Sequence, residues 1–516
     1  MTGLDVGIVV AYFAMIIGVG IYSSKRASTP DNYLVAGHRL GYGITFACLS
    51  AVLLGGASTI GTTALGYTYG ISGIWLVAML GLGLALVGIL LIKRIRELNV
   101  LTVAELLTRR FGSKAGVLSA LVSALYTMMV CATQVIAMGT ILQGLAGWDP
   151  VTSMLVVGFI VVAYTILGGM WAITLTDFIQ FILIVIGVMF VMLPNCVDAA
   201  GGFDALVATL PSSYFDITSI GWPTIIQYFF LYCLGALVGQ DLWQRYLTAK
   251  SVKVARRSGI ASGLFILLYA VACALIGMAA AVYMPGAENT QLVFATMAND
   301  VLPTGALGIV LVAVLAVLMS TASGTLLASS SLLANDVIKP LLESRRARTN
   351  SQEGGASATN GATLVEAGDA AGGAGEAASI AASPAGEAAS ADEASAMAAK
   401  RERPLLRTSR CVTAVVGILA IVVAVALNDV LAALDVSYAI LSGALFFPVI
   451  LGMFWKRATT RAALVSIAAS TVVILVGLAI EGTSAVGPIV WGLVVSIVLM
   501  VGISLFDGKS RAVSER

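Results

Sequence analysis

Hydroxyl side chains gather at the centre of one long apolar stretch, residues 305–339 (GALGIVLVAVLAVLMSTASGTLLASSSLLANDVIK). The cluster consists of Ser320, Thr321, Ser323 and Thr325. If this stretch is a helix that crosses a bilayer, Ser320 lies roughly 22 Å from its start at Gly305, close to the midplane. Neutral oxygens at that depth can bind a monovalent cation without burying a net negative charge. The alternative interpretation is a helix that packs closely on its neighbours through small residues.

The composition of the whole chain supports a membrane setting for this cluster. The chain has 516 residues, of which 59% are hydrophobic and only 11% are charged. A soluble protein could not hide that much apolar surface, so we interpret the chain as an all-α polytopic membrane protein with about 13 transmembrane helices. The predicted spans are residues 4–22, 43–69, 72–92, 115–146, 151–168, 172–193, 222–246, 258–283, 305–335, 410–428, 432–454, 462–480 and 487–506.

Charged residues sort strongly between the two sides of these spans. When the spans alternate in direction, all 29 Lys and Arg residues fall on one side, which leaves none buried in the membrane to pair with a carboxylate. The loops of the other side carry acidic residues: Asp149, Asp198, Asp204, Asp216, Glu288, Asp300, Asp429, Asp435 and Glu481. The positive-inside rule therefore predicts a plasma-membrane protein with its N-terminus outside and its C-terminus in the cytoplasm.

Two spans carry glycines that predict a broken helix. The span 43–69 contains Gly55-Gly56 and then a run of small polar residues, and the span 222–246 contains Gly235 and Gly239, followed by Gln240 and Asp241. Packing glycines are the alternative for each span taken alone. The two breaks are five spans apart, and because five is odd, two five-helix units in series must run in opposite directions, which is the inverted-repeat plan of secondary transporters.

This plan predicts the organisation of the whole chain. Residues 1–41 hold the first helix and a cytoplasmic loop, 42–193 the first repeat, 194–221 an external loop, 222–454 the second repeat, and 455–516 two further helices with a short tail. Within the second repeat, residues 345–403 are rich in Ala, Gly, Ser and Glu and predict a disordered cytoplasmic insert. We interpret the insert as a tolerated loop expansion, with a regulatory role as the alternative.

Two further polar residues lie inside predicted spans. Asp177 is the one carboxylate well inside a span, and buried acids in membranes are costly and usually functional. An N-cap role near the cytoplasmic end of its helix is the alternative. Gln134 is equally suited to a hydrogen bond between helices and to contact with a substrate.

Four motifs resemble the sodium:solute symporters, a family that includes proline, sugar, sialic-acid and choline carriers. They are LVAGHRLG at 34–41, GGMWAITLTDFIQ at 168–180, GQDLWQRYLTAKS at 239–251 and LMSTASGTLLASSSLLANDVIK at 318–339. The resemblance covers nearly the whole chain. It implies the leucine-transporter-like fold, with two inverted five-helix repeats whose first helices are broken, one helix before them and two after.

The resemblance also implies binding residues. One sodium ion (Na+) would be held by the carbonyls of Ala51, Leu54 and Val317 and by the hydroxyls of Ser320 and Thr321. Some members of the family have a second sodium, for which Asp177 and Ser323 would be the ligands here, although Gly324 stands where another hydroxyl would help. The polar candidates for substrate contact are Ser58, Thr59, Gln134 and Gln240.

The function expected from these features is sodium-coupled symport of a small organic solute into the cell by alternating access. We expect the solute and the lipid bilayer as partners, and no enzymatic activity, nucleic-acid partner or obligate protein partner. Proton coupling through Asp177 is the first alternative. A membrane sensor and a channel are less favoured, because the sequence shows neither an output domain nor a repeated filter loop.

Overall fold

The computed structural model describes residues 2–24, 38–341, 407–427, 429–482 and 487–507. Within these ranges the chain is helical without a β-strand, and one isolated bridge joins Leu40 to Ala249. The predicted all-α class is therefore confirmed. The predicted insert at 345–403 lies outside the described residues.

The first part of the chain runs from α1 to α10. Its elements are α1 (Gly3–Ser24), α3 (Tyr42–Leu53), η2 (Ala57–Gly61), α4 (Thr62–Tyr69), η3 (Gly70–Ile74), α5 (Trp75–Leu86), η4 (Val87–Leu91), α6 (Ile92–Leu98), α7 (Val103–Phe111), α8 (Ser113–Ala146), α9 (Pro150–Ile184), η5 (Val185–Met192) and α10 (Leu193–Ala199). The long helix α9 contains a kink at Gly169, where φ is 53° and ψ is −147°, so that it comprises two of the predicted spans.

The second part begins with short peripheral helices. The elements are α11 (Gly202–Thr209), η6 (Ser212–Phe215), α12 (Trp222–Tyr228), η7 (Phe229–Cys233), α13 (Leu234–Val238), α14 (Gln240–Thr248), α15 (Val252–Tyr283), η8 (Thr290–Leu292), α16 (Val293–Val301), α17 (Ala306–Ser331) and η9 (Leu332–Ile338). A helix at Arg407–Leu427 follows, and then α20 (Val430–Phe454), α21 (Thr460–Glu481) and α22 (Gly487–Phe506).

The number of crossings depends on how one helical run is counted. By length and composition, the described residues hold 11 helices able to cross a membrane, or 12 when the bent pair α12–α13 and α14 forms one span. The sequence predicts about 13 spans. The difference lies in residues 57–98, which count as one helix although the backbone leaves the helical region at Gly70, where φ is 64°.

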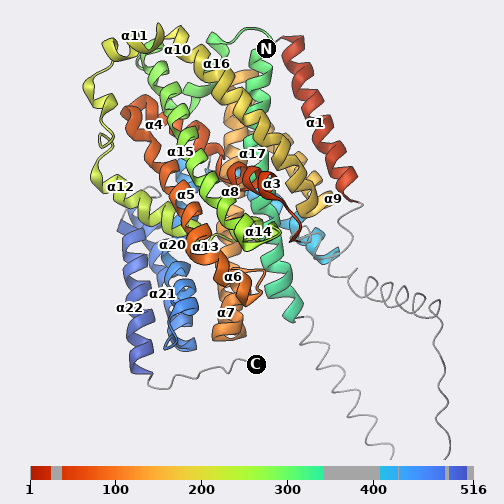
Figure 1. The fold of residues 1–516 in the computed structure, drawn as a ribbon, viewed down its shortest axis with the longest axis vertical. Coiled ribbons are helices and arrows are strands. Elements are labelled where there is room, and N and C mark those ends of the chain that lie inside the picture. The colour runs from red at the N-terminus through yellow and green to blue at the C-terminus, as the bar shows by residue number, and fades with distance from the viewer. Residues whose placement is uncertain (1, 25–37, 342–406, 428, 483–486, 508–516) are drawn as a thin grey trace, which may run out of the picture.

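The run reverses its direction at this glycine. A methyl group on Gly73 would lie 2.7 Å from the backbone nitrogen of Gly66, whereas seven residues of a straight helix would separate these positions by about 10 Å. Dividing the run at Gly70 adds one crossing to the 12, and its first half then continues α3. With an odd number of crossings, α1 begins at one end of the bundle and α22 ends at the other (Figure 1).

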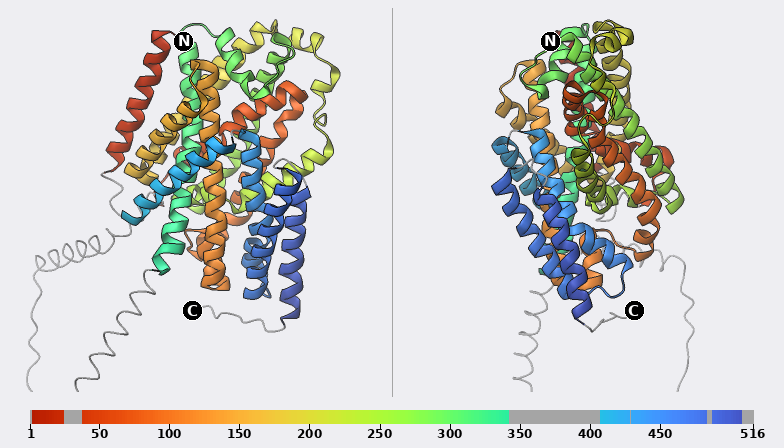
Figure 2. Two further views of the ribbon diagram at one scale, coloured as in Figure 1. Left: turned by 180° about the vertical axis from the view of Figure 1, so that it is seen from behind. Right: turned by 90° about the vertical axis from the view of Figure 1, so that its left-hand side faces the viewer.

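The helix α17 forms the centre of the bundle. In the most apolar 18-residue stretch of the helix that begins with α17, 89% of the residues are buried. The corresponding share for α1, which stands at the edge of the bundle, is 22% (Figure 2). Helices α8 and α9 pack directly on α17, and α3 also contacts it. The hydroxyl cluster of α17 therefore lies deep in the protein interior, away from lipid.

Both predicted helix breaks are present. After α3 ends at Leu53, Leu54 has φ −84° and ψ 41°, and the helix resumes at Ala57. Methyl groups on Gly55 and Gly56 would lie 2.6 Å from Gln134 Oε1 and 2.4 Å from Ala137 Cβ, so the glycine pair permits the close approach of α8. The second break lies between α13 and α14. The backbone at Gly239 is extended, with φ −67° and ψ 120°, and α13 and α14 meet there in a bend of 46°.

Candidate functional site

The hydroxyl of Thr321 joins α17 to the broken end of α3. Its Oγ1 lies 3.0 Å from the carbonyl oxygen of Val52, 3.5 Å from that of Ala51 and 3.3 Å from that of Val317. Thr321 is 4% exposed, and Leu54, at the C-terminal cap of α3, is fully buried. The structure thus gathers neutral oxygens from two helices around one hydroxyl, which is a donor set that suits a monovalent cation.

The neighbouring hydroxyl points to a different partner. Ser320 Oγ donates a hydrogen bond of 2.5 Å to Asp177 Oδ1 on α9. Ser320 and Asp177 are both fully buried, as the sequence predicts for Asp177. The alternative of an N-cap near the cytoplasmic end of its helix does not apply, because Asp177 lies inside α9.

A buried arginine completes this cluster and corrects one expectation. Arg245 on α14 is 1% exposed, although the sequence places every basic residue outside the membrane. Its Nε donates to Asp177 Oδ2 at 3.2 Å, and its Nη2 lies 3.2 Å from the same oxygen. The positive-inside rule places Arg245 in a cytoplasmic loop because this residue lies at the end of a predicted span. The break before α14 instead turns this short helix into the bundle.

Gly324 makes room for the guanidinium group. A methyl group at this position would lie 2.2 Å from Arg245 Nη2 and 2.6 Å from Cζ. Arg245 Nη2 also donates to the carbonyl of Ser320 at 3.4 Å, and Ser323 Oγ donates to the same carbonyl at 3.1 Å. Of the two ligands implied for a second sodium, Asp177 is thus paired with a fixed positive charge, and Ser323 bonds to a carbonyl that the same charge contacts.

A small cavity of about 20 Å³ lies beside the first helix break. Its lining consists of Val52, Leu53, Gly55, Ala57, Ser58, Leu80, Val130, Gln134, Asp241, Thr321, Leu434 and Tyr438. Two of the four predicted substrate contacts, Ser58 and Gln134, are in this set. Ser58 Oγ donates to the Leu53 carbonyl at 2.5 Å, and Gln134 Oε1 accepts from the Gly56 N–H at 2.7 Å, so both also hold the break in place.

The structure does not bring the other two predicted contacts to this cavity. Both polar atoms of the Gln240 side-chain amide are hydrogen-bonded to the backbone. Oε1 accepts from the Val103 N–H at 2.8 Å, and Nε2 donates to the Leu101 carbonyl at 3.2 Å. Thr59 faces α15, where its hydroxyl lies 2.8 Å from that of Tyr269. Both side chains connect elements of the bundle.

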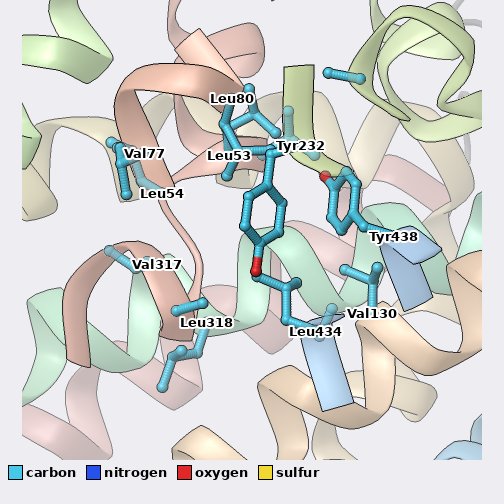
Figure 3. Packing of buried hydrophobic residues seen from close by; sticks show 14 of the residues in the cluster. Leu53, Leu54, Val77, Leu80, Val130, Tyr232, Val317, Leu318, Leu434 and Tyr438 are labelled. Carbon is cyan, nitrogen blue, oxygen red and sulfur yellow. The ribbon is translucent and has the colours of Figure 1, made fainter. Parts of the chain in front are cut away.

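Sequence reasoning missed two polar residues of the cavity wall, Asp241 and Tyr438. Asp241 follows Gln240 directly, is 2% exposed, and accepts a hydrogen bond of 3.3 Å from Tyr126 Oη. The ring of Tyr438 packs on that of Tyr126, with 5.2 Å between centroids. It also packs on the ring of Tyr232 at 5.1 Å (Figure 3). The sequence signal for Asp241 is its place just after Gly239, because residues beside a helix break commonly line binding sites.

Comparison with known proteins places this arrangement in a family. The model of the sodium:solute symporter family matches residues 33–359 and 393–469, which is more than half of the chain. The chain belongs to the sodium:solute symporter family. This membership confirms the resemblance drawn from the four motifs, and it identifies the chain as a multi-pass membrane transport protein.

Individual relatives of this symporter-family chain agree with that assignment. Sodium/proline symporters of Staphylococcus aureus strains JH9 and JH1 are 28% identical to it over 360 residues, which are 67% of this chain and 70% of each relative. Among solved structures, a Na+-coupled sialic acid symporter in a substrate-bound outward-open state superposes with a TM-score of 0.75 at 20% identity, covering 98% of both chains. The closed conformation of Mhp1, a nucleobase-cation-symport-1 family transporter, gives 0.52 at 14% identity, covering 95% and 97%. These likenesses confirm the predicted leucine-transporter-like fold.

Proposed function

We propose that this protein is a secondary transporter that couples the entry of sodium to the uptake of a small organic solute by alternating access. The observation that carries the proposal is the Thr321 hydroxyl, which lies within 3.5 Å of carbonyls from both the broken helix α3 and the central helix α17. Membership of the sodium:solute symporter family supports the choice of sodium.

The proposed sodium ligands are the carbonyls of Ala51, Leu54 and Val317 and the hydroxyls of Ser320 and Thr321. The donor set fits the ion, because all five are neutral oxygens and the surrounding helices exclude lipid. Bound sodium would supply a positive charge that holds α3 against α17. Ser320 Oγ donates its proton to Asp177, and its lone pairs remain available to the ion, so occupation of the site would be felt by the Asp177–Arg245 pair.

We assign the coupling role to this first site alone. A second sodium at Asp177 and Ser323 would have to displace the guanidinium of Arg245, which already neutralises Asp177 and lies over Gly324. Removing one member of a buried ion pair leaves an uncompensated charge and is strongly unfavourable. Coupling by protons would meet the same obstacle, because a proton on Asp177 would break the pair. A single sodium per solute is the simplest scheme.

The solute would bind at the cavity between the two broken helices. In the present conformation the cavity of about 20 Å³ admits little more than one water molecule, so a solute requires the surrounding helices to separate. Alternating access by movement of one repeat against the other would provide that space. We assign the repeats to residues 42–193 and 222–454, with the N-terminus outside and the C-terminus in the cytoplasm of the plasma membrane.

Purified protein in proteoliposomes tests the sodium site. Radiolabelled L-proline and choline serve as first candidate solutes, with uptake measured with and without an inward sodium gradient. Sodium binding without solute is measured separately, as the rise in melting temperature with sodium concentration. Thr321→Ala removes the bridging hydroxyl and should raise the half-saturating sodium concentration at least about tenfold, because ligand bonds to a charged group are strong.

The matched control is Ser330→Ala on the same helix, since Ser330 Oγ only donates back to the Leu326 carbonyl at 2.6 Å. This control should keep the sodium dependence of the parent protein. The proposal fails if Thr321→Ala and Ser330→Ala respond to sodium alike, or if sodium leaves the melting temperature of the parent protein unchanged while potassium raises it.

A further inference from the structure

We propose that the transported solute carries a positively charged nitrogen, which binds against the carboxylate of Asp241. This inference rests on the proposed function and names the substrate class of the same cavity. It starts from the lining: of the residues that border the cavity, Asp241 alone has a charged side chain.

Among the residues that the structure describes, none forms an ion pair with Asp241, since the nearby charge of Arg245 is paired with Asp177. The carboxylate is 2% exposed, and the bond from Tyr126 Oη to its Oδ1 is long, at 3.3 Å. A carboxylate buried at membrane depth is costly unless it is paired or serves a function. The first turn of α14 gives partial compensation through its backbone N–H groups, as helix N-termini do for acids. That role alone would not require the side chain to border a cavity.

The balance of charges around the cavity favours a cationic group. Arg245 lies one helical turn after Asp241, but its guanidinium bonds to Asp177 at 3.2 Å. Two carboxylates and one guanidinium leave one negative charge in this buried cluster. A sodium ion at Thr321 would bring the net charge of the cluster to zero. An anionic solute in the cavity would nevertheless be repelled, because it would lie directly against the negative charge of Asp241. A neutral solute such as a sugar would leave the carboxylate without a counter-charge where it binds.

Aromatic side chains complete a wall that suits an ammonium group. Tyr438 borders the cavity, and its ring contacts the rings of Tyr126 and Tyr232. Tyr232 in turn donates a hydrogen bond to Asp435, so a second carboxylate backs the same aromatic cluster. Cations are attracted to aromatic rings, and the attraction is strongest in desolvated sites such as this one. Carboxylate and tyrosines together therefore favour a positive nitrogen over other polar groups.

Matched pairs of probes test this inference on the purified full-length chain. In each pair the charged nitrogen is replaced by carbon: choline with 3,3-dimethylbutan-1-ol, and L-proline with cyclopentanecarboxylate. D-Glucose and acetate extend the set to a neutral and an anionic probe. The change in melting temperature is recorded in saturating sodium, and the response to sodium alone is recorded without a probe. The variants are Asp241→Asn, Asp241→Glu and the control Asp336→Asn, a half-buried aspartate outside the cavity lining that accepts from Thr102 at 2.8 Å.

We expect an ammonium probe to raise the melting temperature while its carbon analogue does not. Asp241→Asn should weaken the binding of that probe by about ten- to a hundredfold, the effect of losing a charge-assisted hydrogen bond. Asp241→Glu and Asp336→Asn should retain the preference. The inference is overturned if a probe without a positive nitrogen stabilises the protein as strongly as the ammonium probes do. It is also overturned if Asp241→Asn binds an ammonium probe like the parent protein. The rise in melting temperature with sodium alone tests the proposed function separately from the solute. In each variant, the same rise shows that the protein is folded.

Discussion

Replacing Arg245 by Gln removes the positive charge from a buried ion pair, and the structure sets the size of the effect. The two side chains are each 1% exposed and 3.2 Å apart. Removing one partner of such a pair typically costs about 3–5 kcal/mol, because the other charge stays buried without compensation. We therefore expect Arg245→Gln and Asp177→Asn to be strongly destabilising as single variants. The double variant should be less destabilised than the sum of the two, with a coupling of about 1–3 kcal/mol.

The assay is reversible unfolding in mixed micelles of dodecyl maltoside and sodium dodecyl sulfate, with helicity as the signal. The four proteins of the cycle give the coupling free energy directly. The pair Arg461–Asp507 is the matched control, since its atoms are 3.7 Å apart and Arg461 is 76% exposed. Exposed pairs contribute about 0–1 kcal/mol, so Arg461→Gln and Asp507→Asn should be nearly neutral and additive.

Additive effects in the Arg245–Asp177 cycle, equal within error to those of the control pair, would refute this reasoning. Such a result would mean that each charge is solvated independently. It would also remove the argument that Arg245 takes the place of a second sodium, since Asp177 would then be free to accept one.

Two further predictions concern the helix break and the insert. Gly56→Ala should lower stability by about 1–3 kcal/mol through overpacking, because its methyl group would lie 2.4 Å from Ala137 Cβ. The control Gly502→Ala should be neutral, because a methyl group there would have nothing within 4 Å. Equal melting temperatures of the two variants would contradict this prediction. Deleting residues 355–395 should leave uptake per folded molecule near that of the full chain, because a segment so poor in large apolar residues cannot offset the entropy of ordering. Loss of uptake with intact expression would instead assign the insert a part in transport.

Much of the fold follows from sequence because lipid imposes simple rules. Every backbone polar group in hydrocarbon must be paired within its own helix, so long apolar stretches become spans whatever their detailed packing. The breaks are visible for a similar reason, since Gly55-Gly56 and Gly239 interrupt apolar runs that would otherwise continue. The hydroxyls of α17 are recognisable because polar groups at the midplane need partners. The sequence prediction of a cation site within this cluster uses no more than this, whereas the choice of Ser320 and Thr321 as ligands comes from the family resemblance.

The roles of neighbouring residues depend on tertiary structure. Gln240 and Asp241 are adjacent in sequence, yet the first bonds the backbone at 101–103 and the second borders the cavity. Both are buried, and which of them reaches the cavity depends on the bend of 46° at Gly239, an angle that no hydropathy pattern encodes. Arg245 shows the same limit. Its burial depends on a counter-charge, Asp177, that lies 68 residues away in the chain. Hydropathy and charge counting act along the chain, whereas the pairing of distant charges is decided only when the helices pack.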